Sequence, residues 1–295
     1  MEKSIKLLKL IFTPLAFGFF IYFAWSSRNL LVTVFTNAKY HYLILSILIL
    51  MLNHFVISIA TFFILKTVNA TIPYWLVFKI HVARLPARYI PGGIWHTVGR
   101  MMDFHSHGIK PAQLTGFFLL ENIIAAGMAF LLGGIFLWYF RDLSDFWGEI
   151  AKIAFICSII GLILTPRILN YKVKIIKKNY LLTIVTFIPL WFFLTSAFIM
   201  YLSAFSFVLE QSSSVEIGGI FMFSWGVGFL AIFAPQGIGI FEVVAGNMLN
   251  APLSLGSIAV LLAGFRVITV ISDICLWSCL RISNISKLIP NNQKN

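Results

Sequence analysis

The chain has 295 residues, of which 60% are hydrophobic and only 11% are charged, and its mean hydropathy is +0.93. A soluble domain carries about 25% charged residues, so this composition excludes a cytosolic enzyme, a disordered chain and a secreted disulfide scaffold. It indicates a polytopic membrane protein. The net charge of +12 would suggest nucleic acid as a partner of a soluble protein. In a membrane protein it marks cytoplasmic loops and lipid headgroups instead, so we expect a membrane-lipid partner and no nucleic acid.

Seven apolar runs follow one another at residues 8–25, 42–65, 112–140, 150–165, 180–209, 217–234 and 254–280. The first run follows Lys3, Lys6 and Lys9, as the apolar part of a signal peptide would, but no small-residue cleavage site comes after it. We therefore expect this run to remain as a membrane anchor. The fold class predicted for the chain is all-α, a polytopic transmembrane helical bundle of seven or eight spans.

Basic residues mark alternate connections between the runs. Six lie in the loop 66–111 and five in the loop 166–179, whereas 141–149 and 210–216 are mainly acidic. Because basic loops stay in the cytoplasm, this alternation predicts a multi-pass protein with a cytoplasmic N-terminus. We expect residues 1–284 to form a single integral membrane domain, followed by a short polar tail at 285–295.

The side of the C-terminus is left open by this alternation. Seven crossings would place Arg281, Lys287 and Lys294 outside, and eight would place them inside. The difference depends on residues 235–252, which are too short and too polar for an ordinary span. This segment could be broken or re-entrant, a form that membranes tolerate where protein or a water-filled cavity covers the backbone.

One Pro/Gly-broken segment covers residues 81–100, HVARLPARYIPGGIWHTVGR. Pro86 and Pro91 interrupt a helix, and the two glycines that follow allow a sharp turn. A helix that restarts there offers free backbone N–H groups to an anion, and arginine binds phosphate through two hydrogen bonds. Before the break, His81, Arg84 and Arg88 would share one helical face. The predicted headgroup-binding residues are Arg84, Arg88, Pro91, Gly92, Gly93, His96 and Arg100. The alternative is a basic loop whose contacts with lipid headgroups serve only to fix the orientation of the protein in the membrane.

A second break, FAPQGIGIFE at 233–242, repeats the pattern of proline, glycine and isoleucine. Paired Pro/Gly interruptions in the two halves of a chain point to a transporter's substrate site.

Charges inside spans point the same way, because each costs at least about 2.5 kcal/mol to insert and so needs a partner or a purpose. Glu242–Arg266 and Glu121–Arg100 pairs would cancel charge, and the alternative role of such pairs is to fix helix register. The predicted polar translocation route comprises Glu121, Pro235, Gly237, Gly239, Glu242, Arg266 and Asp273.

Other motifs carry no chemistry that we can assign. Asp103, His105 and His107 have metal-like spacing, but no neighbouring Cys or Glu completes a site. The sequence has no Walker loop, no G-x-S-x-G elbow and no dinucleotide fingerprint. We therefore predict no catalytic residue, no metal site and no cofactor.

Two segments resemble a known family. Residues 89–95, YIPGGIW, with Gly99-Arg100 behind them, resemble the Y-x-P-G-x-x-W/G…G/R segment of the lysylphosphatidylglycerol synthase transmembrane-region family. Residues 235–242, PQGIGIFE, resemble its second signature, P-G-G-x-G-x-R-E. Glu121 and Arg266 fall where that family tends to have a glutamate and an arginine. The chain departs from the pattern at Asn122 and Phe241, where an arginine is usual.

The resemblance implies a multi-pass domain of the cell inner (cytoplasmic) membrane that moves or presents lipids. We expect a flippase-like protein that handles an anionic phospholipid or a polyprenyl-phosphate-linked lipid in envelope lipid or surface-glycan biosynthesis. The chain has no aminoacyl-transferase domain, so we do not expect it to make lysylphosphatidylglycerol itself. Glycosyltransferases or other envelope-biosynthesis proteins are the expected protein partners. The alternatives are a membrane glycosyltransferase and a non-catalytic scaffold of a glycan- or lipid-synthesis complex.

Overall fold

The structure is a computed structural model that describes residues 36–89, 95–140, 144–205, 213–231, 234–249 and 254–286, together with a few separate positions between 18 and 32. All regular elements within these residues are helices, and no strand occurs among them. Most of the predicted anchor at 8–25 and most of the tail at 285–295 lie outside the described residues.

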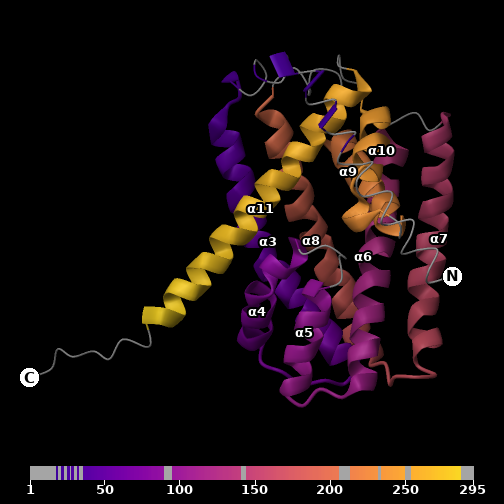
Figure 1. Cartoon of the computed structure of the whole chain (residues 1–295). Coiled ribbons are helices and arrows are strands. Elements are labelled where there is room, and N and C mark those ends of the chain that lie inside the picture. The colour runs from indigo at the N-terminus through magenta and orange to yellow at the C-terminus, as the bar shows by residue number, and fades with distance from the viewer. Residues whose placement is uncertain are drawn as a thin grey trace, which may run out of the picture.

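Five helices are long and apolar enough to cross a membrane. They are α3 (Tyr40–Thr67), α6 (Pro111–Phe140), α7 (Phe146–Leu169), α8 (Lys177–Ser203) and α11 (Leu255–Ser286). Each covers one of the apolar runs, which confirms those runs as helices. The protein is therefore a multi-pass helical membrane protein. The long helices lie side by side, except that α11 slants across the others (Figure 1).

Small and polar side chains hold the long helices together at close range. α3 packs along α8, where the Ser46 hydroxyl donates to the Ala197 carbonyl at 2.7 Å and the hydroxyls of Thr67 and Thr183 lie 3.1 Å apart. α6 packs against α7 and α9 (Ser214–Leu230). A Cβ at Gly133 of α6 would lie 3.0 Å from the backbone nitrogen of Phe223, so glycine allows these backbones to approach. Small residues at such contacts are typical of helices packed in a membrane.

The connection 66–111, which the sequence presents as a loop, contains a helical hairpin. It consists of α4 (Tyr74–Ala83), the 3-10 turn η1 (Leu85–Tyr89) and α5 (Trp95–Ser106). A reading in windows of about 19 residues overlooks α4 because it has only 10 residues. The helix is nevertheless apolar, and it buries Val77, Ile80 and Val82.

This first hairpin begins and ends at one end of the bundle. The Gln113 side chain, in the first turn of α6, donates to the carbonyls of Val68 and Asn69 just before α4. The backbone N–H of Ile176, just before α8, donates to the carbonyl of Thr67 at 2.9 Å. α4 and α5 accordingly occupy the half of the bundle next to this end (Figure 1).

A second hairpin enters from the opposite end. It consists of α9, the 3-10 turn η3 (Pro235–Gly237) and α10 (Ile240–Met248). The opposite end is where the backbone N–H of Lys39, before α3, donates to the carbonyl of Ala204, after α8. Figure 1 shows α9 and α10 in the half of the bundle away from α4 and α5. The sequence counted 217–234 as a full span, whereas α9 has 17 residues and stops before the break.

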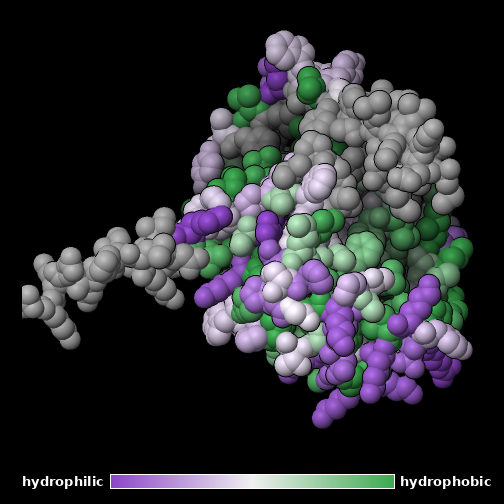
Figure 2. Space-filling model, turned by 60° about the horizontal axis from the view of Figure 1, so that its bottom comes forward, coloured by the Kyte–Doolittle hydropathy of each residue, from purple (hydrophilic) through white to green (hydrophobic). Residues whose placement is uncertain are grey.

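The two ends of the bundle differ in polarity. Figure 2, turned to bring forward the end that carries the connections 68–73, 107–110 and 170–176, shows hydrophilic side chains gathered in the lower part of the view. The exposed basic side chains of this region are Lys110, Arg167, Lys172, Lys174, Lys177 and Lys178. We call it the basic end.

Candidate functional site

The turns of the two hairpins meet at a partly exposed place between the two ends of the bundle. The Gln236 side chain, in η3, donates a short hydrogen bond from its Nε2 to the backbone carbonyl of Arg88 in η1. The Gln236 carbonyl in turn accepts from the Arg266 guanidinium of α11 at 3.2 Å. Segments separated by more than a hundred residues in sequence are therefore joined at one place, which we call the hairpin junction.

Asp273 of α11 collects three donors beside the junction. Its Oδ2 accepts from the Arg88 guanidinium at 3.1 Å and from the Tyr89 hydroxyl at 2.8 Å, and its Oδ1 lies 2.9 Å from Nε2 of His54. The Asp273 side chain is 1% exposed, whereas that of Arg88 is 29% exposed. A buried carboxylate is stable only when it is paired and hydrogen-bonded in this way.

Histidines extend this network across the first hairpin. Nδ1 of His54 in α3 lies 3.0 Å from Nε2 of His81 in α4. The ring centroids of His81 and His96, on the other helix of the hairpin, are 5.4 Å apart. All three rings are buried. Nδ1 of His81 and Nε2 of His96 are buried and have no hydrogen-bond partner among the described residues.

Glu242 and Arg266 form an ion pair on the other side of the junction. Nε of Arg266 donates to Oε1 of Glu242 at 2.6 Å, and Oε2 of Glu242 accepts from the backbone N–H of Gly239 at 2.8 Å. The glutamate thus caps the first turn of α10 while it binds the arginine. The Glu242 side chain is 0% exposed and that of Arg266 is 31% exposed.

Arg100 and Glu121 form a third pair between α5 and α6. Two guanidinium nitrogens of Arg100 donate to the two carboxylate oxygens of Glu121, at 2.9 and 2.5 Å. The Arg100 side chain is 3% exposed, and its guanidinium lies over the ring of Phe117, 5.3 Å from the centroid. The two-bond geometry is the strong form of an arginine–carboxylate contact.

Arg84 has a different carboxylate partner from the other predicted headgroup arginines. α4 ends at Ala83, so Arg84 follows the helix and Arg88 belongs to the 3-10 turn. Pro86 lacks the backbone N–H that a continuing helix would need. The single helical face expected for His81, Arg84 and Arg88 is therefore wrong. Arg84 instead makes a two-bond pair with Asp103 of α5.

The remaining predicted residues lie in the turns. Pro91, Gly92 and Gly93 lie outside the described residues. Pro235 begins η3, and Gly237 and Gly239 have φ angles of +67° and +84° that favour glycine. The predicted Glu242–Arg266 and Glu121–Arg100 pairs are both confirmed.

The sequence analysis missed four members of the site. These are His54, His81 as a partner of His54, Tyr89 as a donor to Asp273, and Gln236. One signal was available for His54, because it interrupts the apolar run 42–65 next to Asn53. A polar residue inside a span is by itself a reason to look for a partner.

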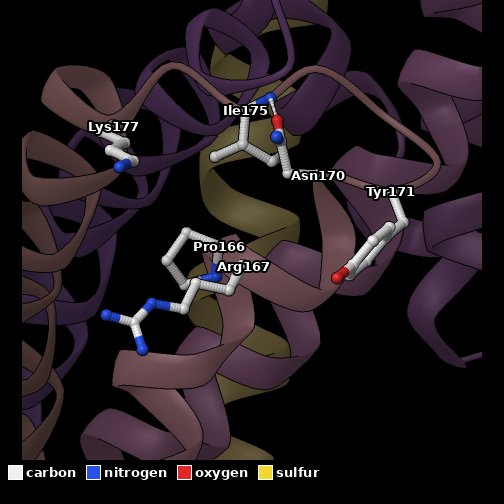
Figure 3. Close-up of a pocket in the computed structure, with 6 residues that line it drawn as sticks. All are labelled: Pro166, Arg167, Asn170, Tyr171, Ile175 and Lys177. Carbon is white, nitrogen blue, oxygen red and sulfur yellow. Dashed lines mark hydrogen bonds between the residues drawn. The ribbon is translucent and has the colours of Figure 1, made fainter.

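A separate pocket of about 420 Å³ lies at the basic end. Its lining residues are Pro166, Arg167, Asn170, Tyr171, Ile175 and Lys177 (Figure 3). The Asn170 side chain accepts from the backbone N–H of Ile175 at 3.0 Å and so holds the connection between α7 and α8 in place. None of these residues belongs to the paired charges of the junction.

Comparison with known proteins adds no relative. No model of a protein family matches the chain, and no curated protein matches it significantly.

Proposed function

We propose that this protein binds an anionic lipid at the hairpin junction and translocates it across the cell inner membrane. A phospholipid and a polyprenyl-phosphate-linked lipid both fit, because the shared chemistry is a phosphate in the headgroup. One observation carries the proposal: the turns of two hairpins from opposite ends of the bundle meet between two arginine–carboxylate pairs, Arg88–Asp273 and Arg266–Glu242. Broken helices that meet inside a membrane bundle are the usual construction of a transporter's substrate site.

The topology that follows from this proposal places every basic segment on one side. If both hairpins are re-entrant, the predicted anchor and the five long helices give six crossings. A cytoplasmic N-terminus then puts the basic end and the C-terminal end of α11 in the cytoplasm. Arg281 and its following lysines fall inside, as the positive-inside rule requires. The choice between seven and eight spans, which the sequence left open, is replaced by six crossings and two hairpins.

The partial exposure of two arginines supports a role in headgroup binding. Arg88 and Arg266 are 29% and 31% exposed, while their carboxylate partners are buried. A guanidinium that already binds a carboxylate in this geometry can bind a phosphate oxygen with the same N–H groups. The carboxylates keep the arginines neutralised while no lipid is bound, which lowers the cost of holding them inside a span.

Reconstitution into vesicles tests the proposal. Phosphatidylcholine vesicles would contain a trace of fluorescent phosphatidylglycerol or of a fluorescent polyprenyl phosphate, and an impermeant quencher would report its movement between leaflets. We expect the purified protein to accelerate movement of at least one of these lipids over protein-free vesicles. No acceleration of either lipid would contradict the proposal.

A matched set of variants tests the residues. The double variant Glu242→Gln with Arg266→Gln removes both charges of one pair and keeps its shape, so no buried charge is left unpaired. We expect it to slow the movement by about tenfold or more, as the loss of a charged hydrogen-bonded contact would. Arg281→Gln, at an exposed arginine of the same helix, is the control and should retain the rate. An unchanged rate in the double variant would remove this pair from the site.

A further inference from the structure

Four buried groups that exchange protons lie in contact from α11 to α5. Asp273 contacts His54, His54 contacts His81, and the His81 ring lies against that of His96. Their residues are 1%, 4%, 0% and 8% exposed, in that order. Chains of carboxylates and histidines inside membrane proteins are typical of proton relays, and an imidazole ring can accept a proton on one nitrogen while it donates one from the other.

The hydrogen bonds fix where protons lie in this chain. An ionised Asp273 only accepts, so Nε2 of His54 carries the hydrogen that it shares with the carboxylate. The Nδ1 of a neutral His54 then accepts, and Nε2 of His81 donates to it. Nδ1 of a neutral His81 is left without a hydrogen. This nitrogen is buried and has no hydrogen-bond partner among the described residues. The hydrogen-bonded series from Asp273 through His54 to His81 therefore ends in a nitrogen that can take up one proton.

We propose that this chain couples headgroup binding to the uptake of one proton. A proton binds Nδ1 of His81, the hydrogen on Nε2 of His81 moves to Nδ1 of His54, and the hydrogen on Nε2 of His54 moves to Oδ1 of Asp273. Both rings end neutral and the carboxyl group holds the added proton. The inference rests on the proposed function, because Arg88 is the group that the proton releases.

Protonation of Asp273 changes the state of Arg88. The neutral carboxyl group no longer pairs with the guanidinium, while the Arg88 backbone stays bound to Gln236. The side chain is already 29% exposed, so it can turn toward a phosphate without opening the junction. The protein then binds one proton and one anionic headgroup in the same step, so the net charge inside the bundle does not change.

Arg88 changes its partner in these steps, and the other charged groups around the relay keep theirs. Those facing His81 are Arg88 of η1 and Arg100 of α5, besides the rings of His54 and His96. Arg100 is neutralised by Glu121 of α6, and Tyr89 of η1 donates to Asp273. His96, whose Nε2 has no partner within the described residues, lies with its ring against that of His81.

The rate of fluorescent phosphatidylglycerol movement, measured from about pH 4, near the ordinary carboxyl range, to about pH 8, tests the coupling. We expect the unmodified protein to be faster at the acidic end by about fivefold or more, the lower range of coupling between two sites. Asp273→Asn imitates the protonated carboxyl group, so it should be fast throughout and independent of pH. His54→Gln interrupts the chain and should remain slow throughout. His41→Gln, at an exposed ring of the same helix, should behave like the unmodified protein.

The outcomes separate this inference from the proposed function. A flat pH profile in the unmodified protein, or an unchanged profile in Asp273→Asn, would overturn the coupling and leave lipid movement standing. If no lipid moves, the proposed function fails, and nitrogen NMR of labelled histidines in the full chain decides the relay. Asp273→Asn should then shift the ring signals of His54 and His81 with that of His41 unchanged. Unshifted signals would overturn the relay.

Discussion

Each arginine of the candidate site forms an ion pair with a carboxylate. Ion pairs in this protein differ in how far their side chains are exposed to solvent. Arg100 and Glu121 are 3% and 19% exposed, whereas Lys152 and Glu149 of α7 are 34% and 60% exposed. An exposed pair contributes about 0 to 1 kcal/mol, because solvent screens it. Removing one partner of a buried pair costs about 3–5 kcal/mol, since the other charge is left unpaired.

We therefore expect that removing one partner of the Arg100–Glu121 pair destabilises the protein more than removing both. Arg100→Met should lower the free energy of unfolding by about 3–5 kcal/mol, and adding Glu121→Leu should recover most of that loss. Thermal unfolding in detergent micelles measures both. Lys152→Met is the control and should change stability by less than about 1 kcal/mol. Equal losses in the single and double variants would mean that packing, not charge, is lost.

A residue of the site could be predicted where its neighbours in the sequence made it unusual, and could not be predicted where only distant segments explained its role. Glu121, Glu242 and Arg266 were identifiable because a charge in an apolar run needs a partner, and few partners are available. The Asp273 network was not, since His54 is 27 residues from His81 and 219 residues from Asp273. Only the packing of α3, α4 and α11 brings these three side chains together.

At the scale of elements, the long helices were predictable and the hairpins were not. Apolar runs of span length identify membrane helices directly. The helices α4, α5 and α10 have 10, 12 and 9 residues, too few to register as spans of about 20 residues. The Pro/Gly breaks did locate both turns, but nothing in their spacing indicated that the turns meet. That contact depends on the side chain of Gln236, a residue with no signal of its own.

The second hairpin depends on a glycine at its turn. Gly237 has a φ of +67°, and a Cβ there would lie 2.8–2.9 Å from backbone atoms of Gly228 at the end of α9. The nearest atoms belong to the backbone, so no side chain can move aside. The close approach of η3 to α9 therefore requires a residue without a Cβ.

Gly237→Ala is expected to displace η3 and loosen the bond between Gln236 and Arg88. We expect a loss of stability of about 1–3 kcal/mol, from the strained backbone and the clash. Thermal unfolding measures this loss, and protease sensitivity of the turn measures the displacement. Gly161→Ala in α7, where a Cβ would meet nothing within 4 Å, is the matched control and should be neutral or slightly stabilising. A stable Gly237→Ala variant with an unchanged turn would contradict the role given to this glycine.

For the molecule as a whole, the two hairpins and the charge distribution lead to the same topology. α8 ends and α9 begins at the end opposite the basic end, and α10 returns there before α11 crosses back (Figure 1). In the topology proposed above, the second hairpin therefore adds no net crossing. With a cytoplasmic N-terminus and the predicted anchor, the C-terminal part of α11 lies on the same side as the basic end.

Labelling of introduced cysteines in intact cells distinguishes this topology from the one with seven crossings. Cys157, Cys275 and Cys279 are exposed and unpaired, so they would first be replaced by alanine. In that background, Ser214→Cys at the start of α9 should react with a membrane-impermeant maleimide added outside. Lys110→Cys and Lys174→Cys at the basic end should react only after the membrane is opened.

The deciding position is Arg281→Cys, on the exposed side of α11. Six crossings with two re-entrant hairpins predict that it is protected in intact cells, because a cytoplasmic arginine there satisfies the positive-inside rule. Seven crossings predict labelling from outside. If Arg281→Cys is labelled while Lys110→Cys is protected, one hairpin must be a full crossing, and the turns could not meet as the proposed translocation requires.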